Sequence, residues 1–325
     1  MNSFQILLST INVNDQSYLE YVATISTQIS EDYVTVTCAR QLFTELILYT
    51  QGHENDEMAI EGLRIVLGKI QPRFITFEDH IYDLRNHLAQ RLEKSGDLLE
   101  AATVLSALPI ENGQRTYETN NKINIYVKIA ELYLRLKDVT NAESYSNRAS
   151  LILHDCKDQE LNLRYKLVYA QLLDRKKKYL DAGQKYVDLS TRVELVAEAK
   201  RIEFLKHALA SAILSGAGQQ RSKLLTILYK DERFQSLGEF SILEKLYLER
   251  IIDQESLQMI FPLLKDQYGD IFDEQGNSET WKEIVEKALV EHNILAASIL
   301  YDNITFDNLG KLLDVNPMEV SHTIS

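Results

Sequence analysis

The sequence predicts an all-α protein made of helical hairpins stacked into a superhelix, an α-solenoid. The first observation is a spacing, repeated about every 40 residues, in which one alanine follows another after 12 positions: Ala89 and Ala101, Ala130 and Ala142, Ala170 and Ala182. A polar or charged turn separates the two alanines of each pair. The second observation is the scarcity of helix breakers, with 4 Pro and 12 Gly in 325 residues. Small residues allow antiparallel helices to approach closely, and each hairpin then buries its apolar face against its neighbours.

The third observation is that apolar residues recur at intervals of three and four, which is the helical period. The series Ile81, Leu84, Leu88 and Leu92 is one example. Hydrophobic residues make up 45% of the chain, which is too many for a disordered protein and enough for a buried core.

The composition also excludes several classes of function. A formal net charge of −13 argues against nucleic acid as a partner, because affinity for phosphate backbones comes from Lys and Arg. No run of about 18 apolar residues is present, so no membrane span is expected. The start, Met1 to Thr10, has no secretory signal. Cys38 and Cys156 are predicted to be buried free thiols, which suits the cytoplasm and nucleus.

Four segments are expected along the chain. Residues 1–30 form a variable N-terminal segment, helical or partly flexible, and 31–215 form the helical-hairpin repeats. Residues 216–302 make the helical part of a C-terminal domain, and 303–325 form an incomplete winged helix.

Helix starts are predicted where a capping side chain stands three residues before a carboxylate, because such a capping box satisfies free backbone amides. Four pairs match: Asp97 with Glu100, Thr140 with Glu143, Thr191 with Glu194, and Thr280 with Glu283. The strand-prone run 34–37 is interpreted as the lead-in to a helix.

The clearest break in the second half is 214–218, which contains two glycines. Helices are then expected at 220–230, 239–250, 254–265 and 280–301, with a loop at 270–278.

The tail from Ile304 to Ser325 has the pattern of a helix–turn–helix. Thr305 is placed to cap its first helix, and Pro317 suits the first turn of its second. The first helix is expected to bury four side chains: Phe306, Leu309, Leu312 and Leu313. A winged helix would need a β-hairpin next, and the sequence ends after the helix–turn–helix. We therefore expect incomplete cover over Leu309, Leu313 and Val320.

No candidate catalytic, cofactor-binding or metal-binding residue emerges. The seven histidines, His53, His80, His87, His154, His207, His292 and His322, include no pair with the i, i+4 spacing of a helical zinc site. Gly216-Ala217-Gly218 resembles half of a dinucleotide fingerprint, but no strand precedes it, so a hinge between helices is predicted. No small-molecule substrate is expected.

Two charged features are candidate binding sites. The basic run Arg175 to Lys178 falls at a hairpin turn, where cations complement the negative end of the preceding helix. The terminal helix–turn–helix suggests DNA binding, but Asp314 to Ser325 contains no Lys or Arg to contact bases or phosphates. A protein contact is the better use of this module.

Several long segments closely resemble the family of the fourth subunit of the COP9 signalosome, a PCI-domain family. They are KIQPRFITFEDHIYDLRNHLA (69–89), KINIYVKIAELYL (122–134), AESYSNRASLIL (142–153), GAGQQRSKLLTILYKDERF (216–234) and VEHNILAASILYDNITFDNLGKLLDV (290–315). The resemblance runs from about Asp32 to the end of the chain and leaves residues 1–31 without a match.

The resemblance implies a TPR-like superhelix of hairpins that continues into a PCI domain ending in a winged helix. It implies a non-catalytic scaffold subunit of the complex that removes NEDD8 from cullin–RING ubiquitin ligases. Such a subunit assembles with other PCI subunits and helps to position or sense the neddylated cullin. The metal-dependent isopeptidase of that family is a different subunit with two His one residue apart, a pattern absent from this sequence.

Two alternatives stay open at this point. One is a PCI scaffold subunit of the 26S proteasome lid, which shares the architecture. The other is a free-standing TPR-like adaptor that binds peptide tails, for which basic and aromatic residues should recur on the inner helices. The inner-helix candidates alternate in sign instead: Lys128, Glu131 and Arg135 on one helix, and Arg164, Lys166 and Asp174 on another.

Overall fold

The computed structural model describes residues 15–31, 34–111, 117–273 and 280–313, and every regular element in these ranges is a helix. The predicted all-α class is therefore confirmed. The chain divides into two compact units, 1–157 and 158–325, each described here by itself. This division falls inside the predicted repeat segment, and the predicted domain boundaries stay a prediction.

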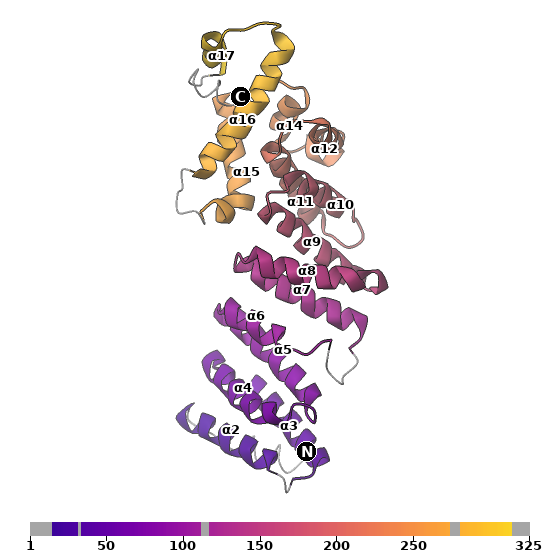
Figure 1. Cartoon of the computed structure of the whole chain (residues 1–325), viewed down its shortest axis with the longest axis vertical. Coiled ribbons are helices and arrows are strands. Elements are labelled where there is room, and N and C mark those ends of the chain that lie inside the picture. Colours follow the sequence, from indigo (N-terminus) through magenta and orange to yellow (C-terminus); the bar gives the residue numbers. More distant parts are fainter. Residues whose placement is uncertain (1–14, 32–33, 112–116, 274–279, 314–325) are drawn as a thin grey trace. The chain divides into compact units, whose positions relative to one another are not determined.

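The first unit is a succession of helices in which each packs on the next along the chain (Figure 1). Its elements are α2 (Asp15–Ser30), α3 (Val36–Gln51), α4 (Asp56–Ile70), η1 (Gln71–Arg73), α5 (Glu78–Ser95), α6 (Leu98–Ser106), α7 (Thr119–Arg135), α8 (Val139–Ile152) and η2 (Leu153–Asp155). Helix α3 begins directly after Thr35, so the strand-prone run is a helix lead-in as predicted.

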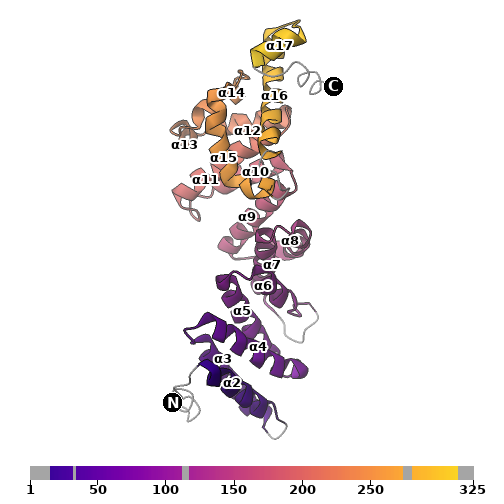
Figure 2. The same cartoon turned by 90° about the vertical axis from the view of Figure 1, so that its left-hand side faces the viewer.

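The second unit begins with one more hairpin, after which the helices gather around α11 (Figure 2). Its elements are α9 (Gln159–Arg175), α10 (Tyr179–Ser190), α11 (Glu198–Leu214), α12 (Gln219–Tyr229), α13 (Glu232–Gln235), α14 (Phe240–Tyr247), α15 (Gln254–Asp273), α16 (Thr280–Leu300) and α17 (Phe306–Leu313). Every residue of α11 from Ala208 to Leu214 is buried. Such a helix, covered on all sides, forms the centre of a core.

The predicted alanine pairs lie where the repeat requires them. The first alanine of each pair lies in α5, α7 or α9, the second lies in α6, α8 or α10, and all six are buried. The two helices of each hairpin pack on one another. The repeat register read from the sequence is confirmed.

The three hairpin turns share a feature that the alanines alone do not predict. The residue seven positions after the first alanine has a positive φ in each turn: 92° at Gly96, 65° at Lys137 and 58° at Lys177. In the second and third turns the next amide bonds back five residues, from Asp138 to Tyr133 O at 2.9 Å and from Lys178 to Leu173 O at 2.9 Å. This left-handed closure turns the chain sharply into the second helix.

The predicted helix caps are partly confirmed. Asp97 accepts a hydrogen bond from the Glu100 amide at 3.1 Å, as expected. At the next hairpin the cap is Asp138, which accepts from the Asn141 amide at 3.0 Å, so the assignment to Thr140 was wrong.

The prediction that a helix begins at Thr191 was also wrong. Helix α10 ends at Ser190, with Thr191 as its C-terminal cap, and the next helix begins only at Glu198. A turn of seven residues intervenes, because Val196 is drawn into the core and the segment bends to reach it.

Other boundaries agree to within a few residues, with exceptions at the C-terminal end. The break at 214–218 separates α11 from α12, and α16 begins at Thr280. The short helix α13 was not predicted, and α15 continues to Asp273, into the segment expected to be a loop. The remainder of that loop, 274–279, lies outside the described residues.

The expected burial in the tail is right for one leucine and wrong for another. Thr305 caps α17 by accepting from the Asn308 amide at 3.4 Å, as predicted. Leu309 is buried, contrary to the expectation of incomplete cover, whereas Leu312, one turn further along the helix, is exposed. The side chains of Phe306 and Leu313, the second helix with Pro317, and Val320 lie outside the described residues.

Both cysteines are less buried than predicted. Cys38 is exposed and Cys156 is half-buried. Cys38 lies next to buried Ala39 on α3, and neighbouring residues on a helix point in different directions. Cys156 lies just after η2, where the chain leaves the helix.

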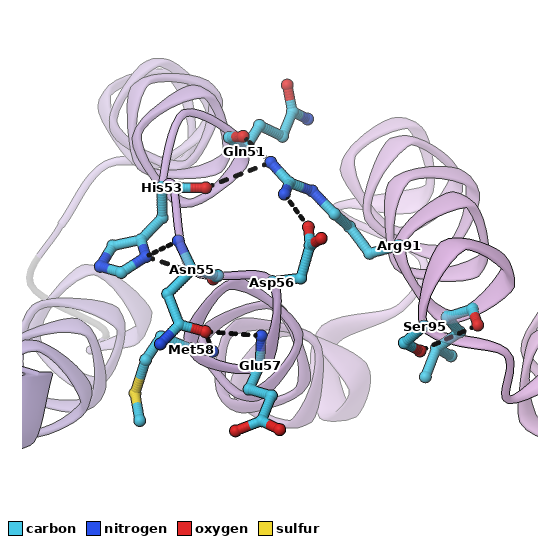
Figure 3. A network of polar contacts seen from close by, with 9 residues as sticks. Gln51, His53, Asn55, Asp56, Glu57, Met58, Arg91 and Ser95 are labelled. Carbon is cyan, nitrogen blue, oxygen red and sulfur yellow. Dashed lines mark hydrogen bonds and ion pairs between the residues drawn. The ribbon is translucent and has the colours of Figure 1, made fainter.

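One arginine of α5 holds the turn between α3 and α4 (Figure 3). The Arg91 guanidinium pairs with Asp56 and donates to the carbonyl oxygens of Gln51 and His53. Asn55 caps α4 by accepting from the Glu57 amide at 3.0 Å. Because the charges satisfy backbone groups of a tight turn, they fix the direction in which α4 begins.

A buried carboxylate joins four helices of the second unit. Asp174 of α9 accepts hydrogen bonds from the hydroxyls of Tyr186 of α10 (2.7 Å) and Tyr268 of α15 (2.9 Å). The amide of Gln267 donates to it at 3.0 Å, and the Tyr268 hydroxyl lies 2.9 Å from Ser211 Oγ of α11. Burial raises the pKa of Asp174 to about 6, even though these hydrogen bonds lower it.

We expect Ala130→Trp to destabilise the protein by about 2 kcal/mol or more, because an indole ring overpacks the contact between α7 and α8. Thermal or denaturant unfolding measures this directly. Ser144→Trp is the matched control, since Ser144 is exposed on α8. Equal stability of Ala130→Trp and the control would contradict the assignment of Ala130 to a helix–helix contact.

Asp174 makes a specific prediction for pH. Its pKa is higher in the folded protein (about 6) than its ordinary value of 3.8, so proton binding favours the folded state. The stability that Asp174 contributes is fully present below about pH 4 and is lost as pH rises through about 6. The difference between the free energy of unfolding of the wild type and that of Asp174→Asn should therefore decrease as the pH rises from about 4 to above 6. Subtraction removes the other titrating groups, and a difference that is constant or rises with pH would refute the prediction.

Candidate protein-interaction surfaces

Two of the charged residues proposed for the inner helices, Lys128 and Arg135, are paired with the preceding hairpin. Glu93 of α5 binds Lys128 Nζ at 2.6 Å and Arg135 Nη1 at 2.7 Å, both from α7. Burial alone would raise the pKa of Glu93, but its two cationic partners outweigh burial and lower it. One hairpin further back, Arg64 of α4 pairs with Glu100 of α6. These ion pairs link successive repeats. Lys128, Arg135 and Arg64 are therefore already paired and are not available to bind an acidic peptide.

The other inner-helix candidates have different surroundings. Asp174 belongs to the buried network described above. Lys166 lines a groove on α9 together with the turn that follows α10. The basic run at 175–178 forms the hairpin turn between α9 and α10, where it was predicted.

An exposed apolar surface lies where α16 leads into α17. We call Ile299, Leu300, Tyr301 and Leu312 the C-terminal apolar surface, because all four side chains are exposed. An open recess of about 740 Å³ lies beside it, lined by Tyr301, Asn303, Ile304, Thr305, Asn308, Lys311 and Leu312. Clustered apolar side chains of this kind mark contacts with other proteins.

Helix α17 is attached by a small core of its own. Leu309 packs against Ala297 of α16, with Ile294 and Ile304 beside them. This contact places α17 against the end of α16, so that Leu312 and Tyr301 line the same recess. The sequence contained a signal for this surface, the consecutive apolar residues 299–301 at the end of a helix, but its exposure depends on the tertiary structure.

The segment 216–218 joins α11 to α12 as a connection between helices, as predicted. Just after it, the buried Arg221 donates from Nε to the Ala212 carbonyl at 2.9 Å. His292 is buried nearby and contacts the Arg250 carbonyl at 3.0 Å. Burial lowers the pKa of His292 to about 4, with a further lowering from the charge of Arg221, so the ring is neutral at physiological pH.

The remaining histidines are spread along the chain, and His322 lies outside the described residues. Among the residues that the structure describes, no group of three or more His, Cys, Asp or Glu could hold a metal ion. In the same ranges no helix is long and apolar enough to cross a membrane.

Stacked hairpins with internally paired charges and an exposed apolar end define a helical-repeat protein that contacts other proteins. Residues 2–198 match the family described as PSMD12/CSN4, N-terminal. COP9 signalosome complex subunit 4 of Drosophila melanogaster is 38% identical over 319 residues, covering 97% of this chain and 75% of the relative. Its counterpart in Dictyostelium discoideum is 37% identical over 274 residues (84% and 68%), and that in Arabidopsis thaliana is 33% identical over 322 residues (96% and 78%).

The chain belongs to the COP9 signalosome subunit 4 family. The resemblance noted in the sequence is thereby confirmed, but the expectation that residues 1–31 have no match was wrong, because the family match begins at residue 2. The resemblance favours the signalosome over the proteasome lid and over a free-standing adaptor.

The pairing of Glu93 with Lys128 should be measurable in a double-mutant cycle. We expect Glu93→Gln and Lys128→Met to show a coupling free energy of about 0.5–1 kcal/mol in unfolding experiments, because both side chains are partly buried. The control cycle combines Glu93→Gln with Lys122→Met on the same helix and should give a coupling near zero. Equal coupling in both cycles would show that the ion pair between repeats does not contribute to stability.

Proposed function

We propose that the chain is a non-catalytic scaffold subunit of the COP9 signalosome, the complex that removes NEDD8 from cullin–RING ubiquitin ligases. It assembles with other PCI subunits and with the subunits that carry the isopeptidase, and it helps to position or sense neddylated cullin. The observation that carries the proposal is membership of the subunit 4 family over nearly the whole chain.

The structure supports this role through two features. The hairpin repeats of the first unit form a framework in which Lys128 and Arg135 of α7 are paired with Glu93 of α5. The C-terminal apolar surface leaves exposed the side chains that a neighbouring subunit would bury. The isopeptidase assignment to another subunit follows from the family resemblance and from the lack of a His-x-His sequence. Free cysteines suit the proposed cytoplasmic and nuclear localisation.

We expect the tagged chain, purified from its own cells, to recover other PCI subunits, the metalloisopeptidase subunit and cullins, identified by mass spectrometry. Recovery of proteasome lid and base subunits in their place would contradict the proposal. If neither signalosome nor proteasome subunits were recovered, a free-standing adaptor would be the better interpretation.

The C-terminal apolar surface is tested in the same purification. Tyr301→Glu with Leu312→Glu should reduce recovery of sister subunits at least about tenfold, because two charges would have to be desolvated at the contact. Leu99→Glu, at an exposed leucine of α6, is the matched control. Both variants should keep the wild-type melting temperature, since the changed side chains are exposed. Full recovery with the double variant would exclude this surface as a subunit contact.

A further inference from the structure

A second surface, a groove at the start of the second unit, shares no residue with the C-terminal apolar surface. One wall is a single face of α9, formed by residues at helical spacing: Gln159, Asn162, Leu163 and Lys166. Leu189 at the end of α10 also lines the groove, and the turn 191–195 forms the opposite wall. The groove has a volume of about 470 Å³, within the range of roughly 300–1,000 Å³ typical of ligand sites.

The turn 191–195 exposes apolar side chains, and internal hydrogen bonds hold its backbone in place. The Val193 amide donates to the Thr191 carbonyl at 3.0 Å, and the Val196 amide donates to the Arg192 carbonyl at 3.1 Å. Val196 is buried and anchors the turn, while Val193 is 67% exposed and Leu195 is 37% exposed. Val193 and Leu195 therefore lie at the rim of the groove on a turn whose backbone is held by hydrogen bonds.

One buried polar atom of the groove has no hydrogen-bond partner. Asn162 Oδ1 is buried and accepts no hydrogen bond within the part of the chain that the structure describes. A buried acceptor without a donor is unfavourable, and a peptide N–H would satisfy it.

The groove carries a net positive charge, whereas the whole chain is negatively charged. Its lining carries two cations, Lys166 and Arg192, and one carboxylate, Glu194, on a protein of net charge −13. Neither cation makes an ion pair with any residue in the described ranges, in contrast to Lys128 and Arg135 of the first unit. Unpaired cations beside apolar side chains favour a ligand that carries both carboxylates and an aliphatic group.

We propose that this groove binds a short, extended peptide segment of a partner protein in which an aliphatic residue is flanked by carboxylates. The aliphatic side chain packs against Leu163 and Val193, the carboxylates pair with Lys166 and Arg192, and Asn162 accepts from the peptide backbone. The groove thereby adds peptide recognition to the subunit contacts proposed above, and it does not depend on them.

A peptide-display selection on the purified 325-residue chain tests the proposal without a known ligand. The library is first depleted on the Lys166→Glu, Arg192→Glu double variant, so that peptides bound elsewhere are removed. We expect the enriched sequences to combine Asp or Glu with Leu, Ile or Val. Enrichment of basic or purely apolar sequences, or no enrichment over the depleted pool, would overturn the proposal.

The affinity of one enriched, fluorescein-labelled peptide then locates the site. The Lys166→Glu, Arg192→Glu variant should weaken binding roughly tenfold or more, because two attractions become repulsions. Val193→Ser should weaken it about threefold or more by removing apolar contact. The control is Lys223→Glu with Lys287→Glu, which changes the net charge equally at exposed positions outside the groove and should stay within about twofold of wild type.

Two results would refute the location. If the control weakens binding as much as the groove variant, the peptide responds to the overall charge of the protein. If all variants keep wild-type affinity, the peptide binds elsewhere. Melting temperatures equal to wild type establish that the variants are folded, as expected for changes at partly or fully exposed side chains.

Discussion

The close approach of antiparallel helices at buried small residues is the constraint on which the rest of the structure depends. Each alanine pair brings two helices together, and the left-handed residue seven positions after the first alanine closes the turn between them. In α10 the constraint extends to Gly183, where a Cβ would lie 2.7 Å from Leu224 Cδ2 of α12. Because the spacing is fixed at both the contact and the turn, hairpins of very different sequence take the same form.

The third hairpin connects this repeat to a different kind of packing. Asp174 stands in the last turn of α9, where its carbonyl accepts from the Lys177 amide of the left-handed turn at 2.9 Å. Its carboxylate meanwhile binds tyrosines from α10 and α15. One residue thus helps to close a hairpin and ties that hairpin to the helices gathered around α11. Removing one partner of such a buried network leaves the others unsatisfied, which makes the junction specific as well as stable.

Much of the fold could be predicted because its signals are local. The alanine spacing, the Asp97 cap, the glycine-containing break at 214–218 and the Thr305 cap each depend on a few neighbouring residues. The failures occurred where backbone conformation or burial decides between local alternatives. Thr140 and Asp138 are both able to cap, and the left-handed Lys137 puts Asp138 in the capping position.

The surfaces were less accessible to sequence reasoning. Thr191 has a proper capping box, yet burial of Val196 keeps the following residues in a turn, and that turn is a wall of the groove. The groove itself combines residues from 159 to 195, and no spacing in the sequence reveals that they meet. Burial of the cysteines was predicted from residue type, which says little about the side of a helix on which a residue lies.

The pairing of charges explains how an acidic scaffold limits its partners. A net charge of −13 repels acidic chains in general, so an acidic segment gains affinity only where local cations face it without competition. In the first unit such cations are engaged: Glu93 holds Lys128 and Arg135, and Asp56 holds Arg91. Lys166 and Arg192 are not engaged in this way, and they stand beside apolar side chains that also favour a ligand. Repulsion over most of the surface and attraction at one groove together give selectivity that neither provides alone.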